Sequence, residues 1–158
     1  MPAESPAHPG VVFPPPLLYV AGLLAGWLLD QWRRLAITPG PSTLRIAGAM
    51  FGVVLWLVIF ASAFATFRRA NTTLIPNRPA TALATGGPYR WTRNPMYVSL
   101  VALYLGAALF MNSWWPVALL PAVVVLVDRL VIAREERYLA AAFRGEYEAY
   151  RSRVRRRV

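Results

Sequence analysis

The sequence predicts an all-α membrane protein with four transmembrane helices and an amphipathic C-terminal helix on the cytosolic side. Three observations support this prediction. Hydrophobic residues make up 57% of the 158 residues, the apolar residues form four long blocks, and the charged residues gather between these blocks. Such an apolar share exceeds that of ordinary soluble domains. We therefore expect residues 1–158 to form one integral-membrane domain.

Each apolar block can cross a bilayer with help from its flanking residues, because about 20 helical residues span the hydrocarbon core. The lead of residues 1–12 has neither the basic side chains nor the cleavage site of a signal peptide, so we expect a short disordered segment there. Beyond the fourth block the apolar residues follow the period of an amphipathic helix, which should lie on the membrane surface or fold back over the bundle. The expected spans are residues 13–31, 44–67, 95–111 and 114–132, and the amphipathic helix covers residues 133–154.

Arginine supplies all the positive charge of the side chains, and its distribution predicts an orientation. All 17 basic residues are arginines, and 14 of them lie in the long loop after the second span or from residue 129 onward. Because positive residues favour the cytoplasmic side, we expect both termini and this loop in the cytoplasm, at a bacterial-type inner or plasma membrane. The arginines follow helix ends, so the expected partner is the lipid bilayer and not nucleic acid.

The reactive side chains are few. The chain has no cysteine, and its single histidine, His8, lies in the proline-rich lead. The missing cysteines exclude disulfides and thiolate chemistry, and we expect no metal site.

Glycines four residues apart occur in the first two spans. They are Gly22 with Gly26, and Gly48 with Gly52. Such pairs let helix backbones approach closely, so the two spans can pack against each other or against a second copy in a homodimer.

The loop between the second and third spans is the most distinctive stretch of the chain. It has about 25 residues, 70–94, and loops of this length are more often functional than spacers. It leads into Gly-Gly-Pro-Tyr-Arg-Trp-Thr-Arg-Asn-Pro-Met-Tyr over residues 86–97, which combines a tight turn with cations and phenols. Asn94 and Pro95 predict a helix start, where the Asn94 side chain can cap exposed amides.

Arg93 should therefore be fixed at the mouth of the third span. With Tyr89 and Tyr97 nearby, it is placed to bind an anion at a membrane boundary, where a water-poor setting strengthens a charge-assisted contact. The alternative is that Arg93 only extends toward lipid phosphate.

Carboxylates near the end of the fourth span are the second candidate group. Asp128 and Glu135 are seven residues apart, which places them on one face of a straight helix, and Glu136 is adjacent. Carboxylates at a membrane edge are costly unless they are paired, and Arg93 is the expected partner. The residues alone favour a plainer interpretation, in which neighbouring cations simply balance these charges. Those cations would be Arg129, Arg134 and Arg137.

Two blocks of the chain resemble the integral-membrane methyltransferases that include isoprenylcysteine carboxyl methyltransferase and the phospholipid N-methyltransferases. The first block is Gly-Pro-Tyr at 87–89 followed by Arg-Asn-Pro-Met-Tyr at 93–97. The second is Glu-Glu-Arg-Tyr-Leu at 135–139, then Phe143 and Tyr-Glu-Ala-Tyr at 147–150. Two positions depart from the family pattern. Asn94 stands where histidine is common, which leans toward the phospholipid-like branch, and Arg144 stands where a glycine follows the phenylalanine.

The resemblance implies a methyltransferase that uses S-adenosylmethionine and a lipophilic acceptor. The acceptor could be a phospholipid amine, an isoprenoid or prenylcysteine-type carboxylate, or another small hydrophobic nucleophile. Arg93 and Glu135 are the expected catalytic residues, Arg93 alternatively orienting the acceptor, and Tyr147 and Tyr150 are either further contacts or packing residues. A second hypothesis is a small structural or assembly membrane protein that keeps the fold without catalysis. The cofactor-binding residues that the resemblance implies are Gly87, Tyr89, Arg93, Asn94, Pro95, Tyr97, Glu135 and Glu136.

Overall fold

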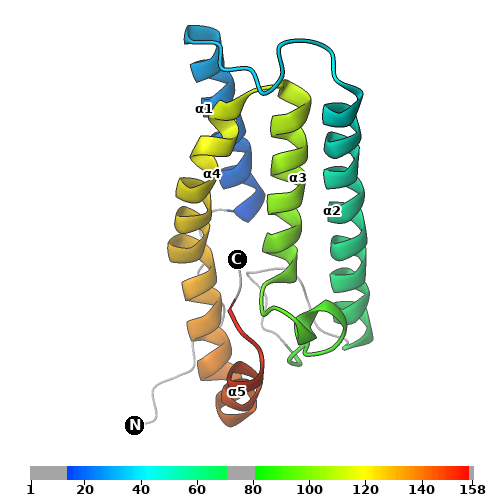
Figure 1. Ribbon diagram of the computed structural model, residues 1–158. Helices are drawn as coiled ribbons and strands as arrows, with labels where there is room; N and C mark the ends of the chain where they lie inside the picture. The colour runs from blue at the N-terminus through cyan, green and yellow to red at the C-terminus, as the bar shows by residue number, and fades with distance from the viewer. Residues whose placement is uncertain (1–13, 71–80, 157–158) are drawn as a thin grey trace.

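The computed structural model describes residues 14–70 and 81–156, and all the regular structure in these two ranges is helical, as expected. The expected disordered lead and the middle of the long loop lie outside the described residues. The elements are α1 (Pro15–Trp32), α2 (Thr43–Arg69), η1 (Gly87–Arg90), α3 (Pro95–Met111), α4 (Trp114–Val127), η2 (Asp128–Ile132) and α5 (Ala133–Arg153) (Figure 1).

Helices α1 to α4 stand side by side as a bundle of two pairs (Figure 1). Helix α2 packs against α3, and α1 packs against α4. At one end of the bundle, called here the hairpin end, residues 33–42 join α1 to α2, while Asn112 and Ser113 join α3 to α4. At the other end, called the tyrosine end, η1, the first turn of α3 and α5 come together.

Two helices of the described chain are long and apolar enough to cross a membrane. One is α2, and the other is the 40-residue helix from Trp114 to Arg153 that runs through α4, η2 and α5. Only 11% and 28% of their most apolar windows are buried, whereas the core helix of a soluble protein is mostly buried. The apolar part of the longer helix lies in α4 and η2, and the polar α5 continues beyond it. Helices α1 and α3 do not pass this test, so four spans stay a prediction.

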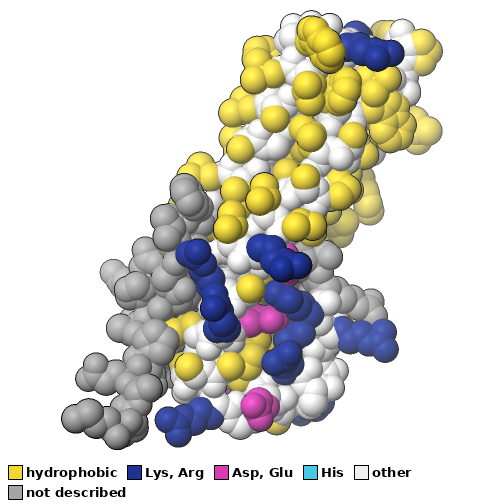
Figure 2. Space-filling view, turned by 90° about the vertical axis from the view of Figure 1, so that its left-hand side faces the viewer, with side chains coloured by type: hydrophobic (Ala, Val, Ile, Leu, Met, Phe, Trp, Pro, Cys, Tyr) yellow, Lys and Arg dark blue, Asp and Glu magenta, His cyan; other side chains and the backbone are white. Residues whose placement is uncertain are grey.

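The apolar and charged side chains separate along the molecule. Figure 2 shows one face that is largely apolar in its upper part, while arginines and acidic side chains gather in its lower part. Large apolar side chains of α2 are open to the surroundings, with Leu44 84% and Phe51 67% exposed. An apolar surface of this extent is typical of a lipid-facing bundle.

The glycine pairs pack inside the chain. A side chain at Gly22 would meet Val123 of α4, and one at Gly26 would meet Pro116 of α4. Gly52 faces Gly106 of α3 in the same way. The glycines of α1 and α2 therefore fit these helices to α4 and α3 and not to one another, and the homodimer stays a prediction.

Helix α4 continues into α5 through η2, a turn of π-helix. In a straight α-helix, residues seven apart lie on the same face. A π-turn inserts about one extra residue, so residues on either side of it share a face when they are eight apart. The expectation that Asp128 and Glu135 share a face is therefore wrong. Asp128 and Glu136 instead contact the same partner, Arg156.

Candidate functional site

Helix α5 folds back over the tyrosine end, which confirms one of the two placements expected for the amphipathic helix. Its tyrosines Tyr147 and Tyr150 are buried in a cluster with Tyr89, Ala63 and Val154. The Tyr150 hydroxyl donates a hydrogen bond to the Tyr89 carbonyl oxygen at 2.8 Å. These contacts tie η1 to α5 through residues that are 61 positions apart in the sequence, and they form one wall of the candidate site.

A break inside α5 allows this return. Arg144 has φ of 36° and ψ of −117°, which lies outside the helical region and is a conformation that glycine adopts most easily. This is the position at which the methyltransferase pattern has glycine. The bend therefore needs a backbone conformation that the glycine of the pattern adopts easily, although this chain has an arginine there.

Arg93 and Glu136 form the central ion pair of the site. Arg93 Nη1 lies 2.9 Å from Glu136 Oε1, and the two side chains are only 10% and 18% exposed. Tyr147 lies close enough to Arg93 for the guanidinium to oppose the rise that burial causes in the Tyr147 pKa. The prediction that Arg93 pairs with one of the carboxylates is thus confirmed for Glu136, whereas Asp128 pairs with Arg156 and not with Arg129, its neighbour in sequence.

Glu135 faces a different partner. The Tyr97 hydroxyl donates a hydrogen bond to Glu135 Oε2 at 2.8 Å. Burial raises the pKa of Glu135 from its ordinary value of 4.5 to about 7, against the opposing effect of the Tyr97 hydrogen bond, and the negative charge of Glu136 raises it further. Near neutral pH this carboxyl group is therefore divided between its protonated and ionised forms.

The site contains buried polar atoms whose hydrogen-bonding capacity is unused. They are Nε and Nη1 of Arg93, Nδ2 of Asn94 and Oε1 of Glu136. Nη1 and Oε1 are at ion-pair distance from each other but are not aligned for a hydrogen bond. Buried polar groups are rarely left without a partner, and those that are need an explanation such as a ligand. Donors and a carboxylate oxygen thus lie together, ready for an anionic and a cationic group.

The expected capping by Asn94 is wrong, and the difference matters for the site. The Asn94 side chain makes no capping hydrogen bond. The Asn94 carbonyl oxygen accepts from the N–H groups of Tyr97 and Val98, each at 3.1 Å, as the carbonyl of an N-cap residue does. A cap would use the side-chain oxygen, whereas the Nδ2 donor of Asn94 is buried inside the site without a partner.

Gly87 and Pro95 shape the loop that carries Arg93. Gly87 has φ of 54°, and a side chain there would collide with the Thr66 hydroxyl of α2, so its close approach is to that helix. Pro95 is buried in the first turn of α3, where a proline needs no N–H partner. Both residues position the site, and their direct contact with a cofactor stays a prediction.

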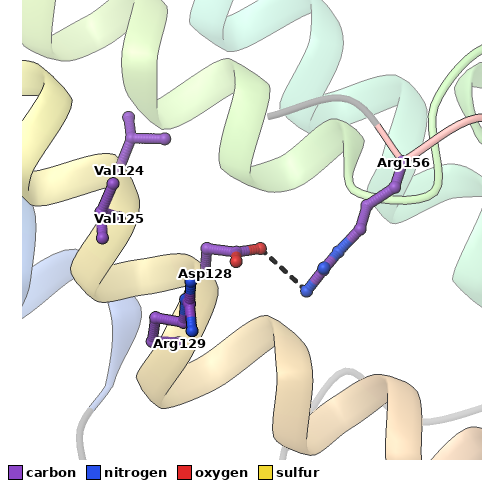
Figure 3. A pocket seen from close by; sticks show the side chains of 5 residues that line it. All are labelled: Val124, Val125, Asp128, Arg129 and Arg156. Carbon is purple, nitrogen blue, oxygen red and sulfur yellow. Dashed lines mark ion pairs between the residues drawn. The ribbon is translucent and has the colours of Figure 1, made fainter.

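Arg156 is the residue that sequence reasoning missed. Its Nη2 lies 2.8 Å from Asp128 Oδ1 and its Nε lies 3.3 Å from Glu136 Oε2. It sits in a run of arginines that gives no signal to single it out. Beside it is a partly open cavity of about 260 Å³ (Figure 3), lined by Val124, Val125, Asp128, Arg129 and Arg156.

Comparisons with known proteins agree with the resemblance in the two blocks. The family model for phospholipid methyltransferases matches residues 43–146. The cobalt-zinc-cadmium resistance protein CzcN of Cupriavidus metallidurans is 31% identical over 137 residues, which are 85% of this chain and 56% of that protein. The chain thus spans little more than half of that relative's length. No solved structure matches the chain significantly.

Proposed function

We propose that this chain, which belongs to the phospholipid methyltransferase family, transfers a methyl group from S-adenosylmethionine to a lipophilic acceptor at the cytosolic face of a membrane. The family and the exposed apolar helices together indicate a membrane protein. The observation that carries the proposal is the set of buried, unsatisfied polar atoms at the tyrosine end. They lie at the end of the apolar bundle, where a water-soluble cofactor and a membrane-bound acceptor can meet.

The residues of the site fit S-adenosylmethionine. Its methionyl end carries a carboxylate and an ammonium group, and its sulfonium carries the activated methyl group. The donors of Arg93 and Asn94 match the carboxylate, and Glu136 matches the ammonium. Tyrosine faces favour a nearby cation, which suits Tyr97 and Tyr147 as walls of the site.

Glu135 has a second task in this proposal. Its ionised form stabilises the positive charge of the bound cofactor, and the Tyr97 hydroxyl holds the carboxylate in place. Methyl transfer is an in-line displacement by a nucleophile with a lone pair, so it depends on alignment more than on an acid or a metal. Alignment of this kind can supply on the order of 7 kcal/mol.

The proposed topology lets the acceptor arrive laterally. Four spans with both termini in the cytoplasm would put the tyrosine end, with its arginines, on the cytosolic side. The acceptor class remains as broad as the sequence suggests: a phospholipid amine, an isoprenoid or prenylcysteine-type carboxylate, or another small hydrophobic nucleophile.

The test is calorimetric titration of S-adenosylmethionine and of S-adenosylhomocysteine into the detergent-solubilised protein. We expect micromolar binding to the wild type and at least a tenfold loss with Arg93→Ala, since a buried charge-assisted contact contributes about 1.5–3 kcal/mol. Arg90→Ala is the matched control, because Arg90 is an exposed arginine three residues earlier in the same loop. It should bind as the wild type does.

Two further results separate the hypotheses. Glu135→Ala should also weaken the binding of S-adenosylmethionine, and labelled methyl groups should then appear in a lipid fraction only with protein that binds the cofactor. If the folded, lipid-supplemented wild type binds neither compound, the proposal fails and the non-catalytic structural protein becomes the better account.

A further inference from the structure

A short segment after α5 returns to the site and closes over it. Helix α5 ends at Arg153, and Val154 is extended, with φ of −118° and ψ of 124°. The side chain of Val154 is buried in the tyrosine cluster. Figure 1 shows this segment, coloured red, running back from α5 beside the bundle. We call residues 154–156 the strap.

Arg156 is the charged end of the strap, and it bridges two acidic residues. Its guanidinium lies against Asp128 at 2.8 Å and Glu136 at 3.3 Å, and Figure 3 shows it reaching across the cavity toward Asp128. Glu136 therefore has an arginine on each oxygen, with Arg93 on Oε1 and Arg156 on Oε2. The two contacts of Glu136 differ in burial, since Arg93 is 10% exposed and Arg156 is 34% exposed.

The charges of this group balance only while the strap is in place. Arg93 and Arg156 supply two positive charges, and Asp128 and Glu136 supply two negative charges. Without Arg156 one negative charge is left over at the edge of the site. A ligand with one net positive charge would restore the balance, and S-adenosylmethionine has that charge because it carries a sulfonium, an ammonium and one carboxylate.

We propose that Arg156 is a built-in cation that occupies Glu136 until a cationic ligand displaces it, so that the strap acts as a latch on the site. The proposal rests on the proposed function, because Glu136 is there the partner of the cofactor's ammonium group. On binding, Arg156 leaves Glu136 and the strap loosens. Arg93 stays, since it is the more deeply buried of the two cations.

The exposure of the pair suits a latch. A guanidinium that is one third exposed forms weaker ion pairs than a buried one, because water and salt screen it. The Arg156 contacts can thus hold the strap in place and still be replaced by a ligand. Arg156 also makes the site selective, because a ligand must bring positive charge to compete with it.

The test compares Arg156→Gln with Arg155→Gln, which removes the same charge from the exposed neighbouring residue. We expect Arg156→Gln to bind S-adenosylmethionine about tenfold more tightly than the wild type. It should bind the neutral S-adenosylhomocysteine only about threefold more tightly, because the ligand's net charge then contributes nothing. Arg155→Gln should leave both affinities within twofold of the wild type.

A second readout follows the strap itself. Limited trypsin digestion of the wild type, followed by intact-mass analysis, should show cleavage after Arg155 and Arg156 that becomes several-fold faster with saturating S-adenosylmethionine. In Arg156→Gln, cleavage after Arg155 should already be fast and should not respond to the ligand.

The outcomes are distinguishable. If Arg156→Gln gains the same affinity for S-adenosylmethionine and for S-adenosylhomocysteine, the substitution only loosens the strap. If Arg156→Gln binds S-adenosylmethionine more weakly than the wild type, Arg156 helps to hold the ligand. Either result, or ligand-induced protection from trypsin, would overturn the latch while leaving the cofactor site intact. If no variant binds either compound, the proposed function and the latch fail together.

Discussion

The two ends of the bundle both bury charged side chains, but the hairpin end pairs them within the fold. Asp30 is only 5% exposed. Its carboxylate accepts hydrogen bonds from the Ser113 hydroxyl at 2.8 Å and from the Leu35 N–H at 3.1 Å, and it forms an ion pair with Arg34. This one side chain joins the end of α1 to the turn between α3 and α4.

Further polar contacts close the same end. The Asn112 side chain accepts from the Thr38 N–H at 2.9 Å and donates to the Thr38 carbonyl at 3.0 Å. Arg45 Nη1 donates to the carbonyl oxygens of Leu109 and Phe110 in the last turn of α3, although its Nε has no partner. The hairpin end therefore uses its polar groups to fix the two connections of the chain at that end.

At the tyrosine end, some buried polar groups have no hydrogen-bond partner within the fold. Arg93, Asn94 and Glu136 keep buried atoms without hydrogen bonds, and Glu136 holds a second cation at its edge. A satisfied network stabilises a fold, whereas a partly satisfied one is costly unless something else completes it. The contrast teaches that buried charge alone does not mark a site in this bundle. Unused bonding capacity gathered on three side chains marks it, whereas among the described residues the hairpin end has a single such atom, on Arg45.

The largest difference between the ends should appear in the free energy of unfolding. Asp30→Ala leaves the Ser113 hydroxyl and the Leu35 amide without their acceptor, and we expect a loss of about 2–5 kcal/mol from these two donors. Arg93→Ala should lose less, about 1–2 kcal/mol, because Glu136 loses a buried partner but keeps its contact with Arg156. Reversible unfolding in detergent micelles measures both. Similar losses from the two variants would remove the distinction between a structural and a functional end.

The second test uses pH, because Glu135 is ionised in the unfolded chain at a pH where it is still protonated in the fold. The pKa of Glu135 is raised from 4.5 to about 7 in the folded protein. The folded protein therefore binds this proton more tightly than the unfolded chain does, and the free energy of unfolding falls as pH rises from 4.5 to about 7, with the decrease complete above pH 7. At 1.36 kcal/mol per pKa unit the full loss is about 3 kcal/mol. Glu135→Gln should remove this pH dependence. Without ligand, the variant should be more stable than the wild type at pH 8 but not at pH 4.

The control for that test is Glu148→Gln, which neutralises an exposed carboxylate in the same helix. Its stability should follow the wild type at each pH. Parallel curves for Glu135→Gln and the wild type between pH 4 and pH 8 would mean that Glu135 is not held in a water-poor setting.

The sequence predicted most of the fold, because the helix ends carry local signals. Pro95 marks the start of α3, and Ser113 caps α4 by accepting from the Trp115 N–H. With η2 counted as the end of the fourth span, the observed helices begin and end within two residues of the expected ones. The partnership of Arg93 with a carboxylate was one of two interpretations that charge and position allowed, and the family resemblance favoured it. These features depend on residues that are close in sequence or alone in an apolar setting.

The remaining features of the site depend on tertiary structure. The π-turn at Asp128 has no local signal, and it changes which carboxylates share a face. Arg156 acquires its role only when the chain returns past Val154, and the Asn94 side chain makes no cap and keeps a buried Nδ2 without a partner. None of these contacts could be inferred from spacing along a straight helix.

The smallest expected effects come from two residues with positive φ, one at each end. Asn112 has φ of 53°, and Arg144 has φ of 36°. Asn112 tolerates this conformation and its side chain bonds Thr38, so Asn112→Gly should cost about 1 kcal/mol through the lost hydrogen bonds. Arg144 is exposed and strained, so Arg144→Gly should stabilise the protein by about 1 kcal/mol.

The opposite signs make this pair a sensitive test of the bend in α5. Unfolding in detergent should rank Arg144→Gly above the wild type and Asn112→Gly below it, while Arg144→Ala, which removes the charge but keeps a side chain at Cβ, should change little. If Arg144→Ala stabilises as much as Arg144→Gly, the gain comes from removing a positive charge and the backbone of α5 is not strained there. If only glycine stabilises, the bend that brings Tyr147 to Arg93 is formed against the preference of the residue at its centre.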